Sequence, residues 1–169
     1  MKIFGFLVLL LLIAAGLMYA DGARLPATHS VSVTGVVPAP PDKVFALITD
    51  VKDASQWRPE VKYVNMLVPD HGRDHWVEHL AYHQFMTFLA VNTQAPTLRQ
   101  VKLDDPYAKY GGTWTYQLSP GPTANSTTLK ITEDGYINPP LYRFIMAHVM
   151  GPTKNLDAYL KDVQAAEGR

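Results

Sequence analysis

The stretch GGTWTYQLSPGPTANSTTLKITEDGYINPPLYRF, residues 111 to 144, changes its hydrophobic period once, and that change indicates the fold. Trp114, Tyr116 and Leu118 alternate with polar residues, as they would in a strand that buries one face. The turn-forming segment PGPTANS then leads to a second strand, TTLKITEDG. From Pro139 onward the apolar residues recur at helical spacing. Two neighbouring strands therefore lead directly into a C-terminal helix.

The predicted C-terminal helix extends to the end of the chain. Asn138 is the expected N-cap and Pro139 the first helical residue, because proline is favoured at that position. Pro152 cannot donate a backbone hydrogen bond, so a kink is expected near Gly151.

The elements upstream complete the order. SVSVTGVV, residues 30 to 37, alternates like a strand, and residues 41 to 57 have the apolar spacing of two short helices. Further strand candidates follow, so that a run of about six strands precedes the C-terminal helix. Strands that occur in one block, rather than alternating with helices, favour an antiparallel sheet and the α+β class.

The composition excludes several classes of function. The chain has 169 residues, enough for one domain and a targeting segment. Lys+Arg and Asp+Glu number 15 each, and this balance argues against a nucleic-acid partner. Cysteine is absent, which excludes disulfides, thiolate zinc sites and a cysteine nucleophile.

The N-terminal run IFGFLVLLLLIAAGLMYA, residues 3 to 20, contains no charge. Eighteen helical residues rise about 27 Å, which nearly matches a hydrocarbon core of about 30 Å. We expect a single-pass anchor, with the domain outside the cytoplasm because the positive charge precedes the run. A cleaved signal, leaving a secreted or periplasmic domain, is the alternative, since small residues precede Ala23. The expected division is an anchor or signal at 1–24, a tether at 25–30 and a domain at 31–169.

Three motifs resemble those of one superfamily. APPDKVFALITDVKDASQWRPEV (39–61), GGTWTYQL (111–118) and ITEDGYINPPLYRF (131–144) are similar to segments of the START-like superfamily, the SRPBCC-type proteins that include polyketide cyclases/dehydrases and lipid-transfer proteins. The likeness covers about residues 31 to 166. It implies a helix-grip fold, in which a curved antiparallel sheet wraps around a long C-terminal helix and leaves an apolar cavity between them.

A histidine-rich stretch, HGRDHWVEHLAYH (71–83), contains the H-x-x-E-H pattern of inverted zinc peptidases at residues 75 to 79. On a helix these histidines share a face, whereas on a strand His75 and His79 lie about 13 Å apart, too far to share a zinc ion. Periodicity leaves both alternatives open. The resemblance favours a strand, with Trp76-Val77-Glu78 as its W-x-E motif and His83 in a turn. We therefore expect no metal site and no cofactor.

The resemblance places several residues at the cavity. The expected ligand-binding residues are Trp76, Glu78, Trp114, Tyr116, Leu118, Glu133, Phe144 and His148. Tyr116 and its neighbours on one face of residues 113–118 should lie opposite the helical turn from Phe144 to His148. Glu133 and His148 are candidates for an acid–base pair, or for a polar pair beside a ligand head group. The sequence assigns no residue a catalytic role.

Three functions remain compatible with the sequence. The leading hypothesis is membrane-tethered binding of a hydrophobic small molecule or lipid in an internal cavity, with the membrane held through residues 3–20. The alternative is a polyketide cyclase/dehydrase-like enzyme that uses acid–base residues in the cavity. The third is an interaction module that has lost the use of its cavity.

Overall fold

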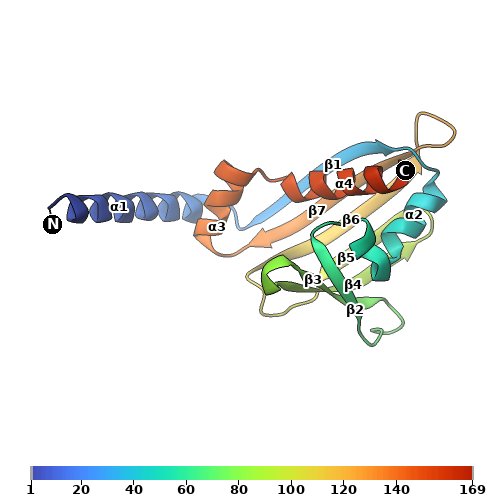
Figure 1. The fold of residues 1–169 in the computed structure, drawn as a ribbon, viewed down its shortest axis with the longest axis horizontal. Helices are drawn as coiled ribbons and strands as arrows, with labels where there is room; N and C mark the ends of the chain where they lie inside the picture. Colours follow the sequence, from blue (N-terminus) through green and yellow to red (C-terminus); the bar gives the residue numbers. More distant parts are fainter. Residues whose placement is uncertain (1, 169) are drawn as a thin grey trace.

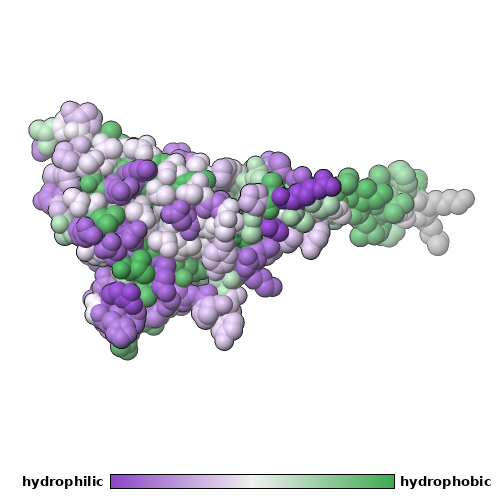
Figure 2. Space-filling view, turned by 180° about the vertical axis from the view of Figure 1, so that it is seen from behind, coloured by the Kyte–Doolittle hydropathy of each residue, from purple (hydrophilic) through white to green (hydrophobic). Residues whose placement is uncertain are grey.

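The N-terminal apolar run forms one helix, α1 (Lys2–Arg24), which projects from a β-sheet domain in the computed structural model; the structure describes residues 2 to 168 (Figure 1). The candidate span Ile3–Arg24 has 22 residues, and an 18-residue window within it has a mean hydropathy of 2.6 and no buried residue. Figure 2 shows this helix as a hydrophobic rod beside a domain surface of mixed polarity. Its length and composition suffice to cross a membrane, and a signal sequence has the same properties.

Seven strands form a single curved sheet, as the block of strand patterns predicts. Their bounds are β1 (Thr28–Val37), β2 (Val61–Met66), β3 (His75–Leu80), β4 (Phe85–Gln94), β5 (Leu98–Leu103), β6 (Tyr110–Pro120) and β7 (Thr127–Ile137). The order across the sheet is β1-β7-β6-β5-β4-β3-β2, and every neighbouring pair is antiparallel. The α+β class is therefore confirmed, and the strands from β2 to β7 form one continuous meander.

Two short helices connect β1 to β2, at the positions predicted. The helix α2 (Pro41–Thr49) begins after an extended Pro40, and the 3₁₀-helix η1 (Val51–Gln56) ends at Trp57. Pro41 at the first helical position suits a site where no backbone donor is needed. The buried face of α2 consists of Val44, Phe45 and Ile48.

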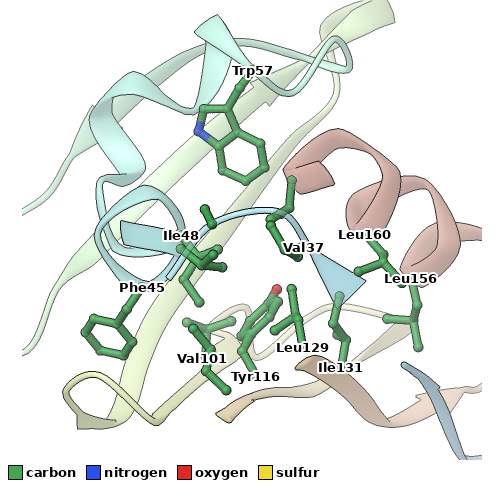
Figure 3. Packing of buried hydrophobic residues seen from close by; sticks show 14 of the residues in the cluster. Val37, Phe45, Ile48, Trp57, Val101, Tyr116, Leu129, Ile131, Leu156 and Leu160 are labelled. Carbon is green, nitrogen blue, oxygen red and sulfur yellow. The ribbon is translucent and has the colours of Figure 1, made fainter. Parts of the chain in front are cut away.

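The core lies between the concave face of the sheet and the helices α2 and α4 (Lys154–Glu167) (Figure 3). Leu129 and Ile131 of β7 are fully buried, and Leu156, Leu160 and Val163 of α4 pack over this part of the sheet. Burying each such aliphatic side chain contributes about 1.5–3 kcal/mol. This core fixes α4 on β1 and β7, and it joins both short helices to the sheet.

The C-terminal helix is interrupted rather than kinked, which corrects the prediction of one continuous helix. The short helix α3 (Pro140–Ile145) starts one residue later than predicted and continues as a π-helical turn, η3 (Met146–Met150). The helix stops at Gly151, whose φ of +86° lies outside the helical region. Pro152 cannot donate the next hydrogen bond of the preceding helix, and a new helix begins at Lys154. Figure 1 shows the consequence: α3 lies beside α1, whereas α4 lies over the sheet.

The histidine-rich stretch forms a strand, as the resemblance indicated. His75 and His79 belong to β3 and lie on the face opposite to Trp76 and Glu78, which are buried. The ring of His79 stacks on Tyr63 at 4.1 Å between centroids. His83 lies in the turn η2 (Ala81–His83) with a positive φ of 58°. The helical geometry that an H-x-x-E-H zinc site requires is therefore not formed.

Substitution of the adjacent valines Val36 and Val37 of β1 measures how much the core contributes to the free energy of unfolding. Val37→Ala removes two buried methyl groups and should lower the free energy of unfolding by roughly 2 kcal/mol or more, because it leaves a cavity. Val36→Ala should cost about 0.5 kcal/mol or less, because Val36 is 44% exposed on the other face. Urea unfolding of the detergent-solubilised chain, followed by tryptophan fluorescence, measures both. Equal losses of unfolding free energy in the two variants would contradict the assignment of Val37 to the buried face of β1.

Candidate functional site

The concave face of the sheet is covered at one end and open at the other. Tyr116 and Ile131 are paired across β6 and β7 and are buried under the helices. Trp114 and Glu133 form the next pair on this face, closer to α3, and both are half-exposed. This difference follows from the interruption at Gly151, because the chain before it leaves the sheet to pack on α1. We call the uncovered part the open half of the concave face.

A row of aromatic rings crosses this face. Trp76 stacks on Phe88 with 5.7 Å between ring centroids, and Phe88 meets Trp114 edge-on at 5.8 Å. Trp76 is buried, whereas Phe88 and Trp114 are half-exposed and pack against the core from its edge. The open half therefore presents the partly exposed rings of Phe88 and Trp114, and Phe88 packs on the buried ring of Trp76.

A polar cluster lies at the edge of this aromatic surface. Glu133 accepts a hydrogen bond from Trp114 Nε1 at 3.1 Å, and its other oxygen lies 3.1 Å from His29 Nε2. His29 is on β1, where its register partner is Gly135. A Cβ at Gly135 would lie 2.7 Å from the imidazole ring, so the missing side chain leaves room for His29. A carboxylate and an imidazole at this distance can exchange a proton with each other or with a bound group.

A second polar cluster is buried and differs in character. Arg58 Nη1 donates to Glu78 Oε1 at 2.8 Å, and Trp76 Nε1 donates to the same oxygen at 3.2 Å. The Arg58 guanidinium also lies over the Tyr159 ring, 5.2 Å from its centroid. Burial lowers the pKa of Arg58, but the negative charges of Glu78 and of Glu60, each 2.8 Å from a guanidinium nitrogen, outweigh this effect, so the net shift is upward. Arg58 therefore stays charged, and the pair is an internal salt bridge.

Two tyrosines close the covered end of the face. The rings of Tyr116 and Tyr159 lie 5.2 Å apart, and Tyr159 also contacts Trp57 edge-on at 5.5 Å. Burial raises the pKa of Tyr116 to about 12 and that of Tyr159 well above its ordinary value. Both hydroxyls are therefore neutral at physiological pH.

Six of the eight predicted site residues lie on the concave face of the sheet. Trp76, Glu78, Tyr116 and Leu118 are buried on the concave face, and Trp114 and Glu133 lie at its open half.

Phe144 and His148 lie elsewhere than predicted. His148 Nε2 is 2.9 Å from Asp21 Oδ2 of α1, and its ring packs on Phe144 at 4.8 Å. Tyr159 of α4, rather than the turn from Phe144 to His148, therefore packs against Tyr116. Since α3 leaves the sheet, helical periodicity alone could not reveal this.

Sequence reasoning missed four residues of these clusters: His29, Arg58, Phe88 and Tyr159. His29 was detectable, because β1 continues its alternation back through Val31 and Val33 to this position. Arg58 gave no signal, since it lies in a turn and meets Glu78 only through tertiary structure.

A small pocket lies between the start of β1 and η3. It has a volume of about 170 Å³, and its lining includes Leu25, His29, Ile137, Arg143 and Met146. A second pocket, of about 360 Å³, lies between α2, η1 and the end of α4. Within residues 2 to 168, no group of three His, Asp or Glu side chains could hold a metal ion.

Comparison with known proteins gives a consistent result. A family model described as polyketide cyclase/dehydrase and lipid transport matches residues 28–162. The Zhui aromatase/cyclase from Streptomyces sp. R1128 has a similar structure, with a TM-score of 0.67 and 18% identity over 84% of this chain and 94% of the other. A START superfamily protein from Mycobacterium smegmatis superposes with a TM-score of 0.63 at 20% identity, over 83% and 97% of the two chains.

Truncated norcoclaurine synthase from Thalictrum flavum also has this fold, with a TM-score of 0.63 and 12% identity over 82% of this chain and 92% of that one. Among curated protein sequences, none matches this chain. At these identities the solved structures show a shared fold, which is the predicted helix-grip.

The buried salt bridge can be tested by removing one partner and then both. Glu78→Gln removes the buried partner of Arg58 and leaves only the more exposed Glu60, 2.8 Å from Arg58 Nε, so it should lower the free energy of unfolding by about 3 kcal/mol, the lower end for a broken buried pair. The double variant Arg58→Met/Glu78→Leu should lose less than Glu78→Gln alone, because no unpaired charge stays buried. Chemical unfolding of the three proteins at neutral pH measures the difference. A double variant that loses as much free energy of unfolding as Glu78→Gln, or more, would contradict this account of the pair.

Proposed function

This chain belongs to the polyketide cyclase/dehydrase and lipid transport family, and we propose that it binds a hydrophobic small molecule or lipid at the open half of its concave face while α1 holds it at a membrane. The observation that carries this proposal is the half-exposed aromatic surface of Phe88 and Trp114. Binding sites for small molecules are concave and largely apolar, with a few polar groups that fix orientation.

The polar pair beside this surface supports an amphipathic ligand. His29 and Glu133 lie at the edge of the aromatic row, where a head group would lie if the apolar part contacted Trp114. The buried Arg58–Glu78 pair is less suited to this role, because Glu78 is 4% exposed and both its charge and its hydrogen bonds are satisfied within the protein. We therefore assign ligand contact to the open half and a structural role to the buried pair.

Membrane attachment suits a ligand of this kind. Transfer of an apolar molecule from a bilayer into water is unfavourable. A binding domain held next to the bilayer shortens the distance that such a molecule must cross in water. The apolar helix α1 supports this location by its length and hydropathy. We propose the uncleaved anchor, with the domain outside the cytoplasm, from the charge distribution around the apolar run.

A polyketide cyclase/dehydrase-like enzyme is the second candidate, and the His29–Glu133 contact favours it. An imidazole 3.1 Å from a carboxylate can take up a proton from a carbon acid and return it to an oxygen. The predicted pair was Glu133 with His148, but His148 contacts α1, so His29 is the proposed partner. The family description includes cyclases and dehydrases, and the solved relatives include an aromatase/cyclase.

Ligand binding can be measured with a fluorescent fatty acid or a naphthalene probe. Trp114→Ala removes aromatic contact of about 1–2 kcal/mol and should weaken binding roughly tenfold. Tyr63→Ala is the control, because this exposed tyrosine packs on His79 on the opposite face, and it should bind the probe like the wild type. Circular dichroism checks that both variants are folded. A folded wild type that binds no apolar probe would favour the interaction module instead.

Enzymatic activity requires a separate measurement. Aldol-type ring closure of a synthetic poly-β-carbonyl compound should be faster with wild type than with Glu133→Gln, by roughly 100-fold or more if the pair is the acid–base catalyst. Binding of an uncharged naphthalene probe, which has no head group, should change little, because the amide occupies the same volume as the carboxylate. Equal rates in wild type and variant, with intact binding in both, would leave the protein as a binder.

A further inference from the structure

We propose that the segment from Pro140 to Met150, which comprises α3 and η3, lies on the lipid surface beside α1 and thereby turns the open half of the concave face toward the bilayer. We call this segment the surface helix. The inference rests on the proposed membrane attachment of α1 and goes beyond it, because it specifies a second contact with the membrane and an orientation of the domain.

The position of the surface helix relative to α1 is the first observation. The apolar run ends at Ala20, and the next residues of α1 contact the surface helix: Asp21 meets His148 at 2.9 Å, and Gly22 packs on Pro140. A Cβ at Gly22 would collide with the Pro140 carbonyl oxygen, so the two backbones are in direct contact. The surface helix therefore joins α1 where an inserted anchor would leave the hydrocarbon core.

The exposed side chains of this segment are the second observation. They are Leu141 (41% exposed), Tyr142 (58%), Val149 (70%) and Met150 (40%). Single exposed apolar residues are common, but four within eleven residues form a patch that usually marks an interaction surface. Other side chains of the segment contact the protein: Phe144 packs on Gly22, the partly exposed His148 contacts Asp21, and Met146 lines the small pocket. The patch has no partner within the described residues 2 to 168.

Tyrosines at the same end of the domain point to lipid rather than to protein as the partner. Tyr110 is paired with Ile137, three residues before α3, so the β5–β6 loop lies at the end of the sheet near the surface helix. Tyr110 is 50% and Tyr107 is 90% exposed, and Tyr19 at the end of the apolar run is 57% exposed. Together with Tyr142 they resemble the aromatic belt that membrane proteins place at head-group depth, where an apolar ring and a hydroxyl are both satisfied.

The orientation has a consequence for the ligand. The small pocket of about 170 Å³ lies between η3 and the start of β1, and both His29 and Arg143 line it. His29 contacts Glu133, which accepts a hydrogen bond from Trp114, so the pocket lies next to the polar pair of the open half. In the proposed orientation this pocket lies on the membrane side of the open half, where a molecule from the bilayer would first meet the domain.

The absence of cysteine permits a direct test in the full-length chain, because single cysteines can be introduced and labelled without background. Val149→Cys and Val68→Cys, each carrying the environment-sensitive fluorophore NBD, are a matched pair. Both valines are exposed, Val149 at 70% and Val68 at 85%, but Val68 lies in the loop between β2 and β3, away from α1 (Figure 1). The labelled proteins are reconstituted into phosphatidylcholine vesicles and recovered by flotation after a carbonate wash.

The expected result is a shorter emission wavelength for the label at position 149, quenching of that label by nitroxide-bearing lipids, and roughly twofold or greater protection from iodide relative to position 68. If the chain floats but position 149 is as accessible to iodide as position 68, α1 is an anchor and the surface helix does not lie on the bilayer. Protection from iodide without quenching by nitroxide lipids would show that protein covers the patch, which also overturns the proposal. A chain that does not float would refute the attachment through α1 itself.

Discussion

The C-terminal helix is interrupted at Gly151 and Pro152, and the placement of α3, η3 and α4 depends on this interruption. Gly151 adopts a positive φ, and Pro152 offers no donor to the preceding turn. The chain before the break is free to pack on α1, while α4 after it packs on β1 and β7. A continuous helix would hold residues 140 to 150 in line with α4, away from the contacts that they make with Asp21 and Gly22. One local constraint thus connects the helix-grip core to the membrane-length helix and sets the extent of the open half.

The two polar clusters on the concave face differ in their burial, and this difference determines which of them can contact a ligand. The Arg58–Glu78 pair lies inside the domain with its hydrogen bonds satisfied, where a lost partner would be costly and no ligand is needed to complete it. The His29–Glu133 pair lies at the half-exposed edge of the aromatic row, where one bound molecule can meet both ring surface and polar atoms. Both clusters use a tryptophan Nε1 as donor to the carboxylate, so each acid is fixed in position by a ring of the same aromatic row.

The proposed location and the proposed ligand support each other physically. A domain that binds apolar molecules gains from a position where such molecules are concentrated, and an apolar helix supplies that position at one end of the sheet. The same end carries the exposed side chains of the surface helix, the tyrosines of the β5–β6 loop and the small pocket next to His29. Within residues 2 to 168, α1 packs on α3 at this end, whereas α2 and η1 lie at the opposite end of the sheet (Figure 1).

The sequence by itself determined the class, the order of the elements and the faces of the strands. The alternation at Trp114, Tyr116 and Leu118 is a local property, since neighbouring side chains on a strand point to opposite sides. The apolar run of α1 and a distortion of the helix near Gly151 were predictable for the same reason, because each depends on a few consecutive residues, but the sequence predicted a kink where the helix in fact stops. The strand at His75 to His79 was ambiguous by periodicity, and resemblance to a family resolved it. Only the tertiary structure decided which residues meet across the fold: Arg58 with Glu78, His29 with Glu133, and His148 with Asp21 rather than with the sheet. These pairs are separated by 20, 104 and 127 residues, and no local pattern specifies the direction that a helix takes after a backbone break.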